Sequence, residues 1–143
     1  MRVLVDTSVW SLALRRAQPD SGPLVQELTE LVREGRALIM GAIRQELLSG
    51  LKTDRQFETL RDHLRAFPDL ELATADFELA ARFYSRCKAS GIQGSNSDFL
   101  LCAVASRRDL SVLTNDGDFG EYRRHVPVKL HEPREVKLHE PRA

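Results

Sequence analysis

Short runs of consecutive apolar residues alternate along this chain with longer segments in which apolar residues recur every three or four positions. Uninterrupted apolar runs are typical of strands buried on both faces, whereas the three-to-four spacing is typical of amphipathic helices. The runs that predict strands cover residues 3–5, 37–40, 70–72, 111–113 and 126–130. This alternation predicts an α/β fold, a three-layer α/β/α domain with a mostly parallel sheet of about five strands.

The helical segments show recognisable start and stop signals. Residues 24–32 carry apolar side chains at i, i+4, i+7 and i+8, and Gly35 is expected to end that helix. Residues 99–105 are apolar almost all round, which predicts a central, buried helix. Pro127 favours an edge position for the last strand. The residues expected to cap helices are Thr7 or Ser8, Thr53 or Asp54, Thr74, and Asn96 or Ser97.

The end of the chain contains a repeat. Residues 128–134 read VKLHEPR, and the same seven letters return at residues 136–142. A single repeat of eight residues does not indicate a solenoid, and a duplicated terminus or a cloning scar is the preferred interpretation. The alternative is that the extra copy adds to the sheet edge of a partner. We therefore expect a domain over residues 1–134 and a disordered or extraneous tail over residues 135–143.

Composition narrows the class of protein. The 143 residues correspond to one domain, with 42% hydrophobic and 29% charged residues, as in ordinary globular proteins. The 21 basic residues balance 21 acidic ones, which argues against a polycation that coats nucleic acid. Of the basic residues 17 are Arg, the better side chain for bidentate phosphate contacts.

Two further features bear on the compartment. No apolar run approaches the roughly 20 residues that span a bilayer, and the N-terminal apolar run is too short for a signal peptide, so no membrane contact and a cytoplasmic location are expected. Cys87 and Cys102 form no CxxC pair and lie in apolar helical patterns. They are interpreted as buried, reduced thiols rather than zinc ligands.

Acidic side chains are expected to meet at one edge of the sheet. Parallel α/β proteins bind ligands at the carboxyl ends of their strands, near the point where the strand order reverses. Asp6 ends the first strand, and Asp116 follows the strand at 111–113, with Asp118 two residues later. Glu46 lies on the helix after the second strand, and Asp98 lies in the first turn of the buried helix.

Each acid also has a purely structural interpretation. Asp6 could cap a helix, Asp98 could complement a helix dipole, and Glu46 could lie on a solvated helix face. Asp116 and Asp118 could form a turn. These interpretations weaken when they are taken together. Glu46 has the small residues Ala42 and Gly50 four positions before and after it, where a solvated face would usually carry more charges, and Asp98 is the only charged residue between Lys88 and Arg107.

Clustered carboxylates need cations unless their pKa values rise. A set of oxygen ligands selects hard cations, Mg²⁺ or Mn²⁺, and the matching chemistry is metal-assisted hydrolysis of phosphodiester bonds. The sequence contains no Ser–His or Cys–His triad, no GxGxxG motif and no P-loop, so no motif indicates a different chemistry. An aspartyl-phosphate phosphohydrolase would need a second Asp two residues after Asp6, where this chain has Ser8.

Four motifs carry a family resemblance. The segment VLVDTSVW at residues 3–10 resembles the N-terminal signature of the PIN-domain ribonucleases, and LTNDGDF at residues 113–119 resembles their late acidic motif. RQELLSG at residues 44–50 and SDFLLCA at residues 97–103 are similar in order and context to the two middle motifs. The resemblance spans residues 1 to about 131, and the length and single-domain layout resemble the VapC toxins of bacterial toxin–antitoxin pairs.

The resemblance implies roles for individual residues. It implies that Asp6, Glu46, Asp98 and Asp116 are the catalytic, metal-binding acids and that Asp118 is a further metal ligand. Thr114, and also Thr7 or Ser8, would form hydrogen bonds within the site. The implied cofactor is Mg²⁺ or Mn²⁺ and the implied substrate is RNA, often tRNA or rRNA. The implied partners are a second copy in a homodimer and a small VapB-type antitoxin whose C-terminal segment lies across the active site.

Two basic residues are selected as RNA contacts. Arg44 lies close in sequence to Glu46, and Arg86 precedes the loop around Gly91, so both are predicted to contact the RNA backbone. The alternative is that both lie on solvated helix faces. The competing function is a PIN-like module that binds RNA or a partner without cleaving, which a missing acid would favour; none of the four is missing.

Overall fold

The computed structural model describes residues 1–15 and 22–135 of the chain. The sequence also predicts a loop at Pro19 and Asp20. This loop and the second copy of the terminal repeat lie outside the described residues. Within these ranges, no helix is long and apolar enough to cross a membrane. The described residues form the strands β1 Val3–Val5, β2 Ala37–Leu38, β3 Ser111–Leu113 and β4 Lys129–Leu130, and the helices α1 Thr7–Leu14, α2 Pro23–Arg33, α3 Gly41–Leu48, α4 Asp54–Leu64, α5 Thr74–Ala89, α6 Asn96–Arg107 and α7 Asp118–Tyr122.

The four strands form one parallel sheet in the order β2-β1-β3-β4. Val3 pairs with Ala37 on one side and with Ser111 on the other. The chain leaves β1 in one direction to form β2 and later returns to the opposite side of β1 to form β3. The strand order therefore reverses between β1 and β3, which is where proteins of this architecture bind ligands.

The predicted α/β class and parallel sheet are confirmed, and three predicted strands are shorter or missing. The strand predicted at 37–40 covers only Ala37–Leu38. The segment 70–72 does not form a strand; the residue before it, Asp69, makes a single parallel bridge with Ile39, and the chain then leads into α5. Pro68 precedes that bridge and has no N–H with which to extend the pairing. The last strand covers two residues instead of five and lies at the sheet edge, as Pro127 indicated.

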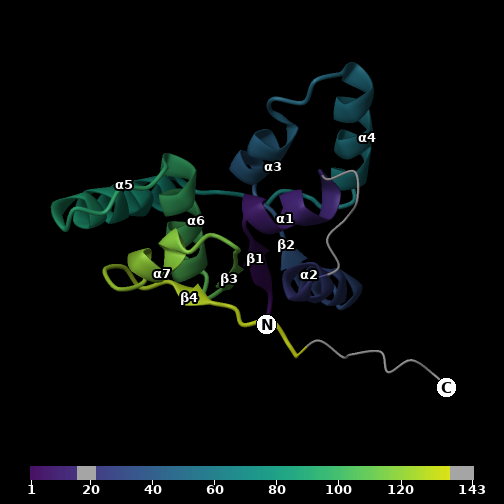
Figure 1. Cartoon of the computed structure of the whole chain (residues 1–143). Coiled ribbons are helices and arrows are strands. Elements are labelled where there is room, and N and C mark those ends of the chain that lie inside the picture. The colour runs from purple at the N-terminus through teal and green to yellow at the C-terminus, as the bar shows by residue number, and fades with distance from the viewer. Residues whose placement is uncertain (16–21, 136–143) are drawn as a thin grey trace.

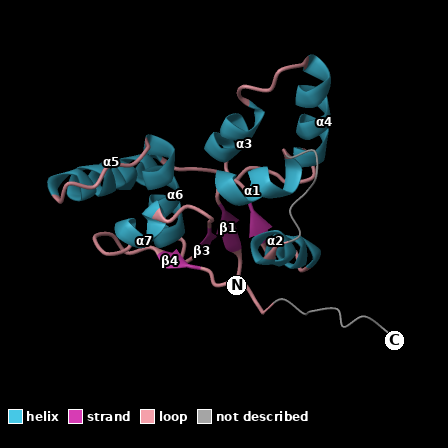
Figure 2. Ribbon diagram, in the orientation of Figure 1, coloured by secondary structure: helices cyan, strands magenta, loops and turns pink. Residues whose placement is uncertain are grey.

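Helices flank the sheet on two sides. Figure 1 shows α5, α6 and α7 grouped to one side of the strands and α1 to α4 grouped to the other. Figure 2 shows the short strands lying centrally among the helices. All residues from Phe99 to Ala105 of α6 are buried, as the apolar pattern predicted. The indole of Trp10 is also buried, and its Nε1 donates a hydrogen bond of 3.2 Å to the carbonyl oxygen of Val5.

Of the residues expected to cap helices, only Thr53 does so with its side chain. Thr53 caps α4, where its Oγ1 accepts a hydrogen bond of 3.1 Å from the Gln56 amide. Helix α6 is capped by Ser95 rather than by Asn96 or Ser97, and the N-cap of α5 is Ala73 rather than Thr74. Helix α1 has Asp6 at its N-cap, because the hydroxyls of Thr7 and Ser8 are directed to carboxylates instead.

The start of α5 is fastened to the end of α6 by a buried carboxylate. Asp76 is fully buried and accepts a hydrogen bond of 2.7 Å from the Ala73 amide. It also accepts hydrogen bonds from Arg107 at 2.6 Å and from Arg108 at 2.9 Å. This cluster satisfies a charge that would otherwise be costly to bury.

Candidate active site

The side chain of Asp6 joins the ends of the two central strands. Asp6 follows β1 directly, and its side chain is buried, with a residue exposure of 5%. The hydroxyls of Ser8 and Thr114 each donate a hydrogen bond of 2.8 Å to Oδ2 of Asp6. Thr114 follows β3, so this carboxylate lies in the crevice where the strand order reverses.

The loop after β3 is folded around the same hydroxyls. The amide of Asp116 donates a hydrogen bond of 2.9 Å to Oγ1 of Thr114, and the amide of Asn115 donates one of 3.0 Å to Oγ of Ser8. Oδ1 of Asp116 accepts a hydrogen bond of 2.9 Å from the amide of Asp118. Asp116 is half-buried and Asp118 is exposed. The two hydroxyls therefore position both the carboxylate of Asp6 and the backbone that carries Asp116.

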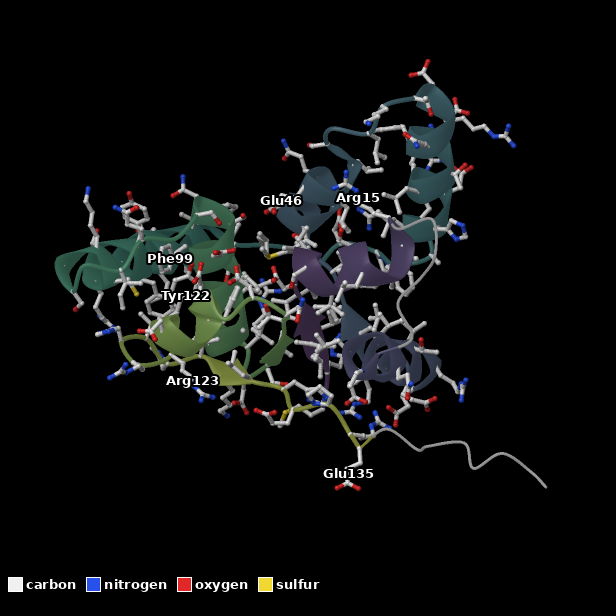
Figure 3. All side chains as sticks on the ribbon, in the orientation of Figure 1. Arg15, Glu46, Phe99, Tyr122, Arg123 and Glu135 are labelled. Carbon is white, nitrogen blue, oxygen red and sulfur yellow. The ribbon has the colours of Figure 1, made fainter. Side chains whose placement is uncertain are left out.

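Asp98 enters the site from the first turn of α6. The Ser95 hydroxyl caps that turn by accepting a hydrogen bond of 3.1 Å from the Asp98 amide. Oδ2 of Asp98 accepts a hydrogen bond of 2.9 Å from the phenol of Tyr122, which is fully buried. The Tyr122 ring packs against Phe99, with centroids 4.9 Å apart, and Figure 3 shows both rings on the same side of the molecule.

The three aspartates Asp6, Asp98 and Asp116 lie in one electrostatic field. Burial raises the pKa of Asp6, the hydroxyls of Ser8 and Thr114 oppose this effect, and the charge of Asp116 adds to it. Burial also raises the pKa of Asp98, and the charges of Asp6 and Asp116 raise it further. Mutual repulsion in a partly desolvated place is the condition under which a bound cation is stabilising.

Glu46 is linked to this group through α1. Its side chain is exposed, and its Oε2 accepts a hydrogen bond of 3.3 Å from the Thr7 hydroxyl. Figure 3 shows Glu46 projecting from α3 toward the side of the molecule that carries Phe99 and Tyr122. The charges of Asp6, Asp98 and Asp116 therefore act on one another, whereas Glu46 is connected to this group only through the Thr7 hydroxyl.

The donor set has the chemistry of a site for a hard divalent cation. All the acids supply oxygen ligands, which Mg²⁺ and Mn²⁺ prefer. Within residues 1–15 and 22–135, no three acidic, His or Cys side chains converge closely enough to hold a metal ion as they stand. The residues therefore fit such a cation by the chemistry of their oxygen atoms and by their charge.

The two arginines predicted to contact RNA have different surroundings. The guanidinium of Arg44 donates to Asp69 at 2.9 Å and to the carbonyl oxygen of Leu64 at 3.0 Å, and it also donates to the carbonyl oxygen of Phe67. These bonds fasten the end of α4 to α3. Arg86 is exposed on α5, and its guanidinium carbon lies 5.7 Å from the centre of the Phe83 ring.

Sequence reasoning missed Tyr122 and Gly94 as parts of the site. A Cβ atom on Gly94 would lie 2.5 Å from the Tyr122 hydroxyl and 2.9 Å from Cε2 of Phe99, so this position needs a glycine. The sequence did offer a signal for Tyr122, which is a tyrosine in an apolar helical pattern, because a buried tyrosine hydroxyl usually has a hydrogen-bond partner. Its partner could not be identified without the fold.

Comparisons with solved structures show a shared fold. The chain is similar to FitAcB from Neisseria gonorrhoeae at 23% identity and a TM-score of 0.72, covering 92% of this chain and 97% of that chain. It is similar to VapBC2 from Rickettsia felis, solved with a DNA fragment from its promoter, at 20% identity and a TM-score of 0.73, covering 92% and 98%. It is also similar to VapBC-5 from Mycobacterium tuberculosis at 22% identity and a TM-score of 0.65, covering 91% and 98%.

Comparisons of sequence give the family. No curated protein matches the chain. The sequence model of the PIN domain matches residues 3–125, which include every acid of the site, from Asp6 to Asp118. The chain therefore belongs to the PIN-domain family.

Proposed function

We propose that this chain is a metal-dependent endoribonuclease and the toxin component of a VapBC-type toxin–antitoxin pair. The observation that carries the proposal is that Asp6 and Asp116, which follow the carboxyl ends of β1 and β3, are electrostatically coupled to Asp98 in the first turn of α6. Membership of the PIN-domain family supports a nuclease. The similarity to FitAcB and VapBC structures supports the toxin assignment.

The three aspartates would hold a Mg²⁺ or Mn²⁺ ion, with Glu46 and Asp118 as further oxygen ligands. When bound, such a cation lowers the pKa of a water molecule and offsets the charge that develops on a phosphodiester during hydrolysis. The chain contributes the positions of the ligands. Ser8 and Thr114 fix one oxygen of Asp6 through two hydrogen bonds of 2.8 Å.

The hydroxyl groups of the site also influence the protonation of the carboxylates. Ser8, Thr114 and Tyr122 each donate a hydrogen bond to a carboxylate oxygen, and these bonds favour the ionised, metal-binding form of Asp6 and Asp98. They therefore oppose the effect of burial, which favours the protonated form. Orientation of the ligands by surrounding groups of this kind commonly contributes 10- to 100-fold to metal affinity.

RNA is the proposed substrate, and exposed arginines are proposed to bind its backbone. Arg86 is exposed and has no acidic partner among the ion pairs of the described residues. It is the better candidate of the two predicted arginines, since Arg44 already donates to three oxygen atoms. A phosphate contact from Arg86 would strengthen binding of any RNA sequence and weaken with added salt.

A homodimer and an antitoxin complete the proposal. Phe77 and Tyr84 of α5 are exposed by 54% and 38%, and together with Ala81 they line a cavity of about 530 Å³ next to the start of α6. Apolar surface of this kind is typical of protein interfaces. We assign this face to the homodimer. Light scattering on the purified chain measures the mass of the assembly and so tests whether the dimer forms. The antitoxin is assigned from the similar complexes alone.

Cleavage of RNA by the purified chain tests the proposed function. Structured RNAs such as tRNA and rRNA are incubated with the protein and Mg²⁺ or Mn²⁺, with and without EDTA. Cleavage is expected only with metal, and it is expected to fall at least 100-fold in Asp6→Asn, since that change removes a proposed metal ligand. The matched control is Asp62→Asn on the exposed face of α4. Cleavage in EDTA, or full activity of Asp6→Asn, would overturn the mechanism. RNA binding without cleavage would support the non-catalytic module instead.

A further inference from the structure

A buried carboxylate on α2 is neutralised by the end of the chain. Glu27 is 2% exposed, and its Oε2 lies 2.6 Å from Nε2 of His131. Its Oε1 lies 2.8 Å from Nε of Arg134, an ion pair without the alignment of a hydrogen bond. Arg134 also pairs with Glu34 at the end of α2. Removing both partners of Glu27 would leave a buried charge without compensation, which is strongly destabilising.

The same terminal segment is held by backbone pairing. Leu130 pairs with Val112 of β3, and the amide of His131 donates a hydrogen bond of 2.8 Å to the carbonyl oxygen of Val112. The ammonium group of Lys129 forms an ion pair with Asp109. Figure 1 shows the chain running from β4 toward α2, so the pairing and the charges are parts of one contact. We call residues 128–134 the latch. We call the β3 edge, together with Glu27, Glu34 and Asp109, the receiver.

The sequence contains the latch twice. Residues 136–142 repeat residues 128–134 without a change. Each side chain that the latch uses therefore has a chemically identical counterpart eight residues later. The counterparts of Lys129, Leu130, His131 and Arg134 are Lys137, Leu138, His139 and Arg142.

We propose that the receiver is a peptide-binding site for an extended segment of the pattern Lys-Leu-His-x-Pro-Arg, and that the chain carries two interchangeable occupants for it. When residues 128–134 dissociate from the receiver, residues 136–142 of the same chain bind there in their place. The exchange replaces each ion pair of the latch by an equivalent one and keeps a strand paired with β3. It lengthens the connection before that strand by eight residues, which must close as a loop. The entropy of closing a loop rises only with the logarithm of its length, so the exchanged register is accessible. The repeat of the same chain also has a higher effective concentration than that of another chain.

Removing the contacts of the first copy tests this exchange. His131→Ala with Arg134→Ala is made in the full chain and in a chain shortened to residue 135. In the shortened chain, Glu27 loses both partners, and the melting temperature is expected to fall by about 5 °C or more. In the full chain, the fall is expected to be less than half as large, because His139 and Arg142 replace the missing partners. An equal fall in both chains would overturn the proposal.

The matched control for these variants is Glu132→Ala. Glu132 is exposed and makes none of the contacts above, so it should have no effect in either chain. If the double variant of the shortened chain does not fold, Arg134→Ala alone is compared between the same two chains. A difference between the chains that also appears with Glu132→Ala would overturn the proposal, because it would not depend on the receiver.

A chemical cross-link reports directly which copy is bound. A carbodiimide joins an ion-paired lysine and carboxylate by an amide bond, so the wild-type chain should link Lys129 to Asp109. In the His131→Ala, Arg134→Ala chain, the link should move to Lys137, which peptide mass analysis distinguishes from Lys129. The Lys137–Asp109 link should lie within one chain, so its peptide should be found in the product of monomer mass at every protein concentration. No Lys137 link, or a Lys137 link found only in products of dimer mass, would overturn exchange within one chain. Neither result depends on the proposed nuclease activity.

Discussion

The phenol of Tyr122 donates a hydrogen bond of 2.9 Å to Oδ2 of Asp98, 24 residues before it in the chain. The bond joins α7 to the first turn of α6, and the Tyr122 ring is buried against Phe99 and Phe119. Asp98 is therefore held from one side by a rigid aromatic cluster. The relationship makes Tyr122 a positioning residue for a proposed metal ligand.

Tyr122→Phe should weaken the proposed metal site without unfolding the protein. The change keeps the packed ring and removes only the donor to Asp98, so Mn²⁺ affinity measured by calorimetry should fall 10- to 100-fold. The far-ultraviolet circular dichroism should not change. Tyr84→Phe, on a half-exposed ring of α5, is the matched control and should bind Mn²⁺ like the wild type. Unchanged Mn²⁺ affinity in Tyr122→Phe would show that this bond does not position a metal ligand.

Gly94→Ala should destabilise the fold and disturb the same bond. The added Cβ would lie 2.5 Å from the Tyr122 hydroxyl, and a buried ring cannot move away easily, so a loss of about 1–3 kcal/mol in the free energy of unfolding is expected. Chemical denaturation measures it. The control is Gly120→Ala within α7, where a Cβ has no neighbour within 4 Å and helix propensity favours alanine. Equal stability of the two variants would contradict the steric argument.

Asp76 should make the stability of the fold depend on acid pH. Burial alone would raise its pKa, but the Ala73 amide, Arg107 and Arg108 outweigh burial and hold the pKa below the usual value of 3.8. A lowered carboxylate pKa stabilises the folded state at every pH above that of the unfolded group. The stabilisation is then lost as the pH falls below about 4 toward the folded pKa.

Asp76→Asn tests this sign. At pH 7 the variant should lose about 3 kcal/mol or more, because two arginines lose a buried carboxylate, and the deficit relative to wild type should shrink as the pH falls below 4. Urea unfolding of both proteins at pH 7, 5 and 3 gives the difference. Asp62→Asn breaks only an exposed ion pair with Arg61 and should cost less than about 1 kcal/mol. A deficit that grew toward pH 3 would reverse the sign and refute the account.

The two cysteines should be unreactive in the folded protein. Cys87 and Cys102 are fully buried, and burial raises the pKa of both thiols. The thiolate is the reactive form, so a disulfide-exchange reagent at pH 8 should label neither thiol in the native protein and both in urea. Rapid labelling of the native protein would contradict this prediction and would mean that α5, which carries Cys87, or α6, which carries Cys102, opens locally.

The sequence was sufficient for the parts of the fold that depend on periodicity. The apolar runs at 3–5 and 111–113 became the central strands, and the apolar segment 99–105 became the buried helix α6. The segment 70–72 has the same apolar character as a strand but forms none, and only Asp69 before it makes a bridge, because pairing depends on a neighbour that the local sequence does not specify. Helix caps failed for a similar reason, as at Ser8, whose hydroxyl bonds to Asp6 instead.

The candidate site was predictable in its acids and not in their supports. Asp6 and Asp116 follow strands, and parallel strands end at one edge, so their proximity follows from topology. The partner of Tyr122 is set by how α7 packs on α6, and the steric need for Gly94 arises only from that packing. The engagement of Arg44 by oxygens of Leu64, Phe67 and Asp69 likewise depends on where α4 ends.

The bond between Thr114 and Asp6 spans 108 residues and has a consequence during synthesis. A ribosome that adds about 5–20 residues per second makes Asp6 roughly 5–20 s before it makes Thr114. Throughout that interval the nascent chain contains Asp6 but lacks the complete β3, the Thr114 hydroxyl and Asp116, which complete the crevice. The hydrolytic capacity proposed for this protein is therefore withheld from the translating ribosome until nearly the whole domain has been made.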